Sequence, residues 1–300
     1  MVTNVEKVKK IDVHLHATMW NREELYPTAR IQTADEVRAN FERSGTERGF
    51  VLSLISPDSN DKMQSNEEMA YLANTNPDIL NWFCNVDPRM LTNSSESNFS
   101  DMLMFYKSRG AIGFGEVTAN LYTDDPRMDN LFYHAAACDL PVTIHIAPNL
   151  GRRYGIADEL GLPRLEKMLK KHENLKIIGH SPCFWSEIGD DVTERNRNGY
   201  VRGKVNPGRV VSLMRECPNL YCDISADSGY TAISRDPEFS YRFIEEFSDR
   251  IMYASDTLFP NYMPPQVAWL DEACERGDIS YENYRKICRD NAIRIFKLDI

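Results

Sequence analysis

The sequence lacks the features that mark membrane, secreted and dinucleotide-binding proteins. No apolar run approaches the roughly 18 residues that a transmembrane helix needs. The N-terminus, MVTNVEKVKK, continues directly into IDVHLHATMW without the apolar stretch of a signal peptide. No G-x-G-x-x-G motif opens a helix, as it would in a dinucleotide-binding fold. We therefore expect a cytoplasmic protein that has no membrane partner.

Paired cysteines and an excess of positive charge are also missing. The seven cysteines are odd in number and none forms a C-x-x-C pair, which argues against a disulfide framework or a structural zinc site. The 35 basic residues are outnumbered by 45 acidic ones, giving a formal net charge of -10. This balance disfavours a broad electropositive surface for nucleic acid. We expect a small-molecule substrate and no nucleic-acid partner.

What is present is a regular alternation of strand-like and helix-like segments over residues 1–300, without a linker between domains. Predicted strands are 10–16, 49–55, 80–87, 111–117, 142–146, 175–180, 220–225 and 250–255. Predicted helices are 34–43, 64–74, 99–108, 128–138, 165–172, 209–216, 238–247 and 281–296. Eight strands is the number of a (β/α)8 TIM barrel, which we predict as a single domain. An open doubly wound sheet would show the same alternation.

Histidines gather at the ends of the predicted strands. His14 and His16 lie two positions apart in DVHLH, so both side chains point to one face of a strand. His145 ends the strand in PVTIHIAP, His180 ends the one in LKIIGHSP, and Asp256 follows the last strand in RIMYASDTLFP. The carboxyl ends of barrel strands converge on one face, so these five residues can surround one divalent ion. The remaining histidines, His134 and His172, fall in predicted helices and receive no role.

This pattern, together with the tail KICRDNAIRIFKL, resembles the amidohydrolase superfamily. The resemblance is closest to the amidohydrolase-2 branch, which includes metal-dependent hydrolases and non-oxidative decarboxylases. It implies that His14, His16 and Asp256 bind a metal, that His145 or His180 completes the site, and that the other of these two faces the substrate. His180 is thus also a catalytic candidate. Asp256 would act as the general base. The expected cofactor is one or two divalent ions, zinc first, with manganese or iron as alternatives.

Glu116 is a further candidate metal ligand. In AIGFGEVTAN it ends the fourth predicted strand, where many members of the superfamily carry a carboxylated lysine that bridges two metals. A glutamate could bridge a second ion, as in the TatD-type nucleases that the GEV segment also resembles. It could equally orient a ligand histidine from behind, a common arrangement around metal-bound imidazoles. The sequence leaves both roles open.

Two loops supply candidates for substrate binding. The long segment after His180, SPCFWSEIGDDVTERNRNGYVRGKV, is predicted to be a lid or specificity loop. Arg202 in this loop, and Arg153 in the loop after His145, are predicted to bind an anionic substrate, because guanidinium groups make forked contacts to carboxylates and phosphates. Trp185 is predicted to wall the pocket, or alternatively to pack beneath the loop. Other residues that could reach the mouth are Arg152, Tyr154, Arg195, Arg197 and Lys204; Asp223, on the seventh strand, is left without a role.

Three functions are compatible with these residues. The leading prediction is hydrolysis of an amide, ester or lactone bond in a small, anionic molecule by metal-activated water. The alternative is metal-dependent, non-oxidative decarboxylation of a small carboxylic acid. A third reading is a barrel that binds a ligand without catalysis, which the intact Asp256 argues against. The family resemblance also suggests a homo-oligomer.

Overall fold

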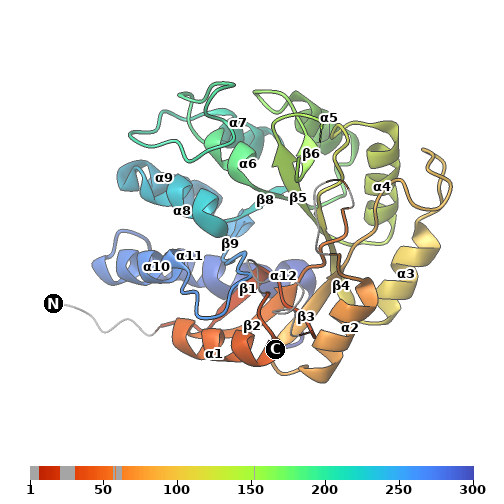
Figure 1. Ribbon diagram of the computed structural model, residues 1–300. Coiled ribbons are helices and arrows are strands. Elements are labelled where there is room, and N and C mark those ends of the chain that lie inside the picture. The colour runs from red at the N-terminus through yellow and green to blue at the C-terminus, as the bar shows by residue number, and fades with distance from the viewer. Residues whose placement is uncertain (1–6, 21–30, 57, 59–62, 152) are drawn as a thin grey trace.

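The computed structural model describes residues 7–20, 31–56, 58, 63–151 and 153–300. Eight parallel strands form one sheet in the order in which they occur in the chain. They are β1 (Lys10–Leu15), β2 (Thr46–Val51), β3 (Leu80–Cys84), β4 (Ala111–Val117), β5 (Val142–Ala147), β7 (Ile177–His180), β8 (Leu220–Asp223) and β9 (Ile251–Met252). A two-residue strand, β6 (Ile156–Ala157), pairs with β5 outside this path. Figure 1 shows the strands at the centre, with helices arranged around them.

Backbone hydrogen bonds between the first and last strands close the sheet into a barrel. Val13 N–H donates to the Tyr253 carbonyl at 3.2 Å, Asp256 N–H to the His14 carbonyl at 2.7 Å and His16 N–H to the Thr257 carbonyl at 2.9 Å. An open sheet would leave these two edges far apart. The closure therefore decides between the two architectures that share the alternating pattern, and it brings Asp256 beside the two histidines of the first strand.

The helices form the outer layer. They are α1 (Ala34–Ser44), α2 (Asn66–Thr75), α3 (Ser100–Ser108), α4 (Pro126–Ala137), α5 (Pro163–Lys171), α6 (Pro182–Ser186), α7 (Arg209–Glu216), α8 (Ala226–Ser234), α9 (Pro237–Phe247), α10 (Pro265–Arg276), α11 (Tyr281–Arg285) and α12 (Asn291–Phe296). A 3-10 turn, Ser248–Arg250, precedes β9, and a π-helical turn, Lys286–Asp290, joins α11 to α12. In the described part of the chain, no helix is both long and apolar enough to span a bilayer.

Apolar strand residues fill the barrel. Ile11, Phe50 and Phe83 are fully buried and belong to a cluster that also contains Phe296 of α12. The ring of Phe296 lies 4.9 Å from that of Phe50 and 5.3 Å from that of Phe83. A second, larger cluster lies between the strands and the surrounding helices. Two buried layers of this kind hold the strands rigidly, so the residues at the strand ends have fixed relative positions.

All eight predicted barrel strands and the helical character of 281–296 are confirmed, with ends that differ by a few residues. The pattern did not predict β6, α6, α8 or α10. β6 and α6 are too short to show a period in the sequence.

The loop after β7, predicted to be a lid or specificity loop, is anchored to the rest of the barrel. The buried guanidinium of Arg197 donates to the carbonyls of Asp158 and Glu159, both at 3.0 Å.

Candidate active site

Seven side chains with metal-binding or acid-base chemistry lie at the carboxyl ends of the strands. They are His14 on β1, His16 directly after it, Glu116 on β4, His145 on β5, His180 on β7, Asp223 on β8 and Asp256 shortly after β9. The register of the sheet pairs His145 with His180. Five of the seven are at most 2% exposed, whereas the side chains of His145 and Asp256 are 17% and 20% exposed. The cluster is thus buried on all but one side.

Three imidazoles point their Nε2 atoms toward one carboxylate. These atoms of His14, His16 and His180 lie 3.5, 3.2 and 3.5 Å from the carboxylate oxygens of Asp256. Bonds of about 2.0–2.1 Å to a tetrahedral zinc ion would separate its ligands by about 3.3 Å. The same three atoms lie 3.7 to 3.9 Å from the oxygens of Glu116. Asp256 therefore stands at the spacing of a shared ligand, and Glu116 is slightly farther away.

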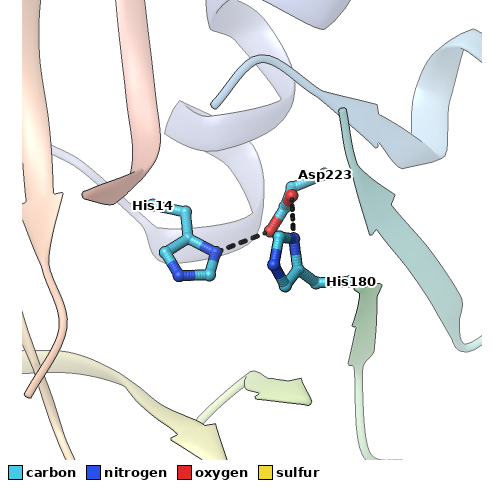
Figure 2. Close-up of side chains that lie close together, drawn as sticks. All are labelled: His14, His180 and Asp223. Carbon is cyan, nitrogen blue, oxygen red and sulfur yellow. Dashed lines mark hydrogen bonds and ion pairs between the residues drawn. The ribbon is translucent and has the colours of Figure 1, made fainter. Parts of the chain in front are cut away.

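The Nδ1 atom of each of these three rings, on the side away from Asp256, has a hydrogen-bond partner. Figure 2 shows Asp223 between two of them: its carboxylate oxygens lie 3.1 Å from His14 Nδ1 and 3.1 Å from His180 Nδ1. His16 Nδ1 lies 2.9 Å from the Leu52 carbonyl. An acceptor at Nδ1 requires the proton on that nitrogen and leaves the Nε2 lone pair directed into the cluster. This is the tautomer that a metal ligand needs.

The residues fit a divalent ion. His14 Nε2 is buried and has no hydrogen-bond partner among the residues that the structure describes, although buried polar atoms are rarely left unpaired. Three imidazole nitrogens and a carboxylate oxygen form a donor set that zinc, manganese and iron accept. Besides the group that Asp223 completes, two further groups of possible ligands occur at this end of the barrel, and they share no residue with each other: His14, His16 and Asp256, and Glu116, His145 and His180.

His145 is oriented differently from the other three histidines. Its Nδ1 lies 2.7 Å from Glu116 Oε1, on the inner side of the ring. The second oxygen of Glu116 accepts a hydrogen bond of 2.7 Å from the Tyr154 hydroxyl. Burial and the Glu116 carboxylate raise the pKa of Tyr154 well above its usual value, so its hydroxyl remains a donor. Glu116 is thus bound on both oxygens by groups that line the open side.

The charged groups of the cluster strongly shift one another's pKa. Burial alone would lower the pKa of His14, but Asp256, Asp223 and Glu116 outweigh it and raise this pKa well above the usual value. Burial opposes the same shift in His180, where Asp223 raises the pKa to about 10. Burial would raise the pKa values of Asp223 and Asp256, yet the imidazoles hold both well below the usual range. The buried carboxylates are therefore stabilised as anions by neighbouring positive charge, which either protonated imidazoles or a metal ion can supply.

A cavity of about 160 Å³ opens onto this cluster. Its lining includes His16, Glu116, His145 and Asp256, and three further residues complete it: Leu54, Tyr154 and Leu258. His180 does not line it. The described lining contains no lysine or arginine.

The residues predicted to bind substrate lie elsewhere. Trp185 is 2% exposed on α6, its indole N–H donates to the Asp223 carbonyl at 3.0 Å, and it is not among the described residues that line the cavity, as expected for a side chain packed beneath the loop. Arg153 and Arg202 are exposed and are not among the cavity-lining residues. Arg152 lies outside the described residues. His134 and His172 contact Ser100 and Asp129 on the outer helices.

Sequence reasoning missed the roles of Asp223 and Ser225. The Ser225 hydroxyl lies 2.8 Å from His180 Nδ1 and also contacts Asp223. An aspartate at the end of a buried strand in YCDIS is a usable signal, because the strand before it ends in His180 and the strand after it leads to Asp256. For Tyr154 the sequence predicts only a position near the mouth of the barrel. Its contact with Glu116 has no signal in the sequence, since it depends on how the loop after β5 folds back.

Comparisons with known proteins agree with this arrangement. The sequence model of the Amidohydrolase family matches residues 11–298. No curated protein matches the chain significantly. A 5-carboxyvanillate decarboxylase from Sphingomonas paucimobilis is similar in structure, with a TM-score of 0.62, 16% identity and coverage of 97% of this chain and 100% of that one.

Two further structures share the fold. A dihydroxybenzoic acid decarboxylase from Polaromonas sp. JS666, with bound manganese and the inhibitor 2-nitroresorcinol, has a TM-score of 0.59 at 16% identity and covers 98% of each chain. A probable 2-pyrone-4,6-dicarboxylic acid hydrolase from Acinetobacter baumannii, with citric acid bound, has a TM-score of 0.58 at 12% identity over 97% of this chain and 100% of that one. At such identities these structures establish the fold alone. With the family match across nearly its whole length, the chain belongs to the amidohydrolase family, in the amidohydrolase-2 branch.

Proposed function

We propose that this protein is a metal-dependent decarboxylase of a small, planar carboxylic acid. The observation that carries the proposal is the cavity over the cluster: it is small, its added walls are Leu54, Tyr154 and Leu258, and its described lining offers no cationic side chain. A cavity of about 150 Å³ is known to hold one benzene ring. The carboxylate of a ring of that size would have the bound ion as its positively charged partner.

The similar structures support this proposal over the leading sequence prediction of a hydrolase. Two of the three are named as decarboxylases, and the third is named for a substrate with two carboxyl groups. Each of the three names contains a planar ring that carries at least one carboxyl group. We therefore favour what was the alternative in the sequence analysis.

His14, His16, His180 and Asp256 would hold the ion, because their facing atoms have the spacing of shared ligands. When bound, the ion supplies a Lewis acid that polarises and orients substrate oxygens. We propose zinc, with manganese as the alternative that the Polaromonas structure favours. His180 is 1% exposed and lies away from the cavity, so we assign it to the ion rather than to the substrate. Glu116, bound by His145 and Tyr154, orients these side chains rather than bridging a second ion.

Loss of CO2 breaks one carbon–carbon bond and leaves its electron pair on the ring carbon, which must receive a proton. Asp256 is the acid-base group that both lines the cavity and contacts the histidines, so we propose that its carboxylate takes up a proton from solvent and passes it to the ring carbon. His145 lines the same cavity, and its side chain is 17% exposed, so it lies between the cavity and solvent. The apolar walls exclude water, which favours conversion of a charged carboxylate into neutral CO2.

Hydrolysis is the second candidate, because Asp256 is equally placed to take a proton from an attacking water molecule and return it to a leaving group. The two reactions are separated by isotope incorporation. Protein loaded with zinc or manganese would be incubated with a panel of hydroxybenzoic and pyrone carboxylic acids in D2O, and in parallel in H2(18)O. We expect the wild type to release CO2 and to leave one deuterium on the ring carbon of the product. The Asp256→Asn variant should show neither CO2 release nor deuterium incorporation. Incorporation of 18O into the product without CO2 would establish the hydrolase instead.

A further inference from the structure

Tyr154 is held in place by the chain on either side of it. After the loop that follows β5, β6 pairs back onto β5, with Ile156 opposite Ile146. Gly155 has a φ of 121°, and a Cβ there would lie 2.6 Å from the His145 carbonyl oxygen, so only glycine fits. The Gly155 N–H also donates to the Thr118 carbonyl at 3.2 Å. The segment is thus pressed against the ends of β4 and β5.

The side chain of Tyr154 is fixed as well. Its hydroxyl donates to Glu116 Oε2 at 2.7 Å, and its ring meets the His145 ring edge-on at 4.8 Å. Both partners lie on different strands of the barrel. The ring also lines the cavity and is its one aromatic carbocycle within the described lining, where the other apolar residues are Leu54 and Leu258.

We propose that Tyr154 is the specificity-determining residue of the cavity: its anchored ring is the wall that selects planar over puckered carboxylic acids. The inference rests on the proposed function, because it takes the substrate to be a carboxylic acid bound beside the metal. A rigid aromatic face packs well against a flat ring in offset or edge-on geometry. A saturated ring of the same carbon number is thicker and would have to displace Tyr154, which Glu116, His145 and Gly155 hold from three sides.

The test compares two acids that differ in planarity. Binding of benzoate and of cyclohexanecarboxylate to manganese-loaded protein would be measured by calorimetry in the wild type, Tyr154→Phe and Tyr154→Leu, with metal content determined in each sample. We expect the wild type to prefer benzoate by about tenfold, the difference that about 1.4 kcal/mol produces. Tyr154→Phe keeps the aromatic ring, so its ratio of benzoate affinity to cyclohexanecarboxylate affinity should stay within about threefold of the wild-type ratio. In Tyr154→Leu this ratio should be close to one.

Tyr133→Phe is the matched control, because Tyr133 is 61% exposed on α4 and is not part of the cavity lining. General destabilisation of the protein would weaken the binding of both acids equally and leave the ratio of their affinities unchanged. The inference is overturned if Tyr154→Leu keeps the wild-type ratio, or if metal-loaded wild type shows no preference for benzoate. Failure of the proposed function looks different: wild-type protein would then bind no metal, or would release no CO2 from any acid although the ratio behaves as expected.

Discussion

The two halves of the cluster differ in which ring nitrogen of their histidines faces the interior of the cluster. In the half formed by β1, β7 and β8, the Nδ1 atoms of His14 and His180 face Asp223, which lies behind them, and their Nε2 atoms face inward. In the half formed by β4 and β5, His145 turns its Nδ1 toward Glu116 and is partly exposed. The first arrangement prepares buried lone pairs for an ion. The second places hydrogen-bonded groups beside a cavity, where a substrate can contact them.

The largest effect should follow from removing a proposed metal ligand from the half formed by β1, β7 and β8. Replacing His14 by alanine removes a proposed ligand whose Nε2 has no hydrogen-bond partner among the described residues. We expect the metal content to fall below about a tenth of the wild-type value, and kcat/KM for any substrate to fall by roughly a thousandfold or more. Elemental analysis of protein purified without added metal measures the first quantity directly. A His14→Ala protein that keeps its metal would contradict the assignment.

The pH dependence of metal binding should be nearly as large. The metal-free protein holds protons on imidazoles whose pKa values are raised, to about 10 for His180, so at neutral pH a metal must displace them. Affinity must therefore increase as pH rises, by about tenfold per pH unit for each proton released. Calorimetric titration with Mn2+ at pH 6, 7 and 8 should show at least a hundredfold decrease in Kd across the range. A Kd independent of pH would mean that the imidazoles are already deprotonated.

A smaller effect is expected at Asp223, which contacts the Nδ1 atoms of two proposed metal ligands, His14 and His180, on the side away from the proposed ion. Asp223→Asn removes the charge that fixes two Nδ1 protons, and should weaken metal binding by about 10–100-fold. Asp78→Asn is the control, because Asp78 pairs with Arg38 on the surface and its side chain is 60% exposed. Equal metal affinity in Asp223→Asn and wild type would show that Asp223 only supports the fold.

The smallest effects should come from the arginines outside the cavity. Arg153→Ala and Arg202→Ala remove exposed side chains that do not line it. We expect kcat and KM to stay within about twofold of the wild type in both variants. An increase in KM of tenfold or more for a carboxylated substrate in either variant would restore the role that the sequence suggested for that residue.

The sequence predicts the eight strands and the chemical side chains at their ends well, because both depend on local pattern; the closure of the barrel depends on hydrogen bonds between the first and last strands. Periodicity marks each strand, and a polar residue after a buried strand falls on the catalytic face. It does not predict how those side chains are turned. His145 and His180 look alike in the sequence and are neighbours in register, yet the ring nitrogen that faces inward depends on Glu116 and Asp223, which come from other strands.

Trp185 and Tyr154 show the same limit in loops. Trp185 lies in a loop that reads as exposed, but a five-residue helix buries it beneath the Asp223 backbone. Tyr154 reaches the cavity because a two-residue strand folds its segment back onto β5. Such short elements form through tertiary pairing rather than through their own propensity, so no pattern in the sequence indicates them.

The most direct test of the account is the metal content of two matched variants, His180→Gln and His145→Gln. Both remove an imidazole and retain a polar side chain of similar length. We predict that His180→Gln loses its metal, while His145→Gln keeps about one equivalent and loses turnover, because His145 faces Glu116 and the cavity. The reverse result, with metal lost from His145→Gln and retained in His180→Gln, would contradict the division of the cluster into an ion-holding half and a substrate-facing half.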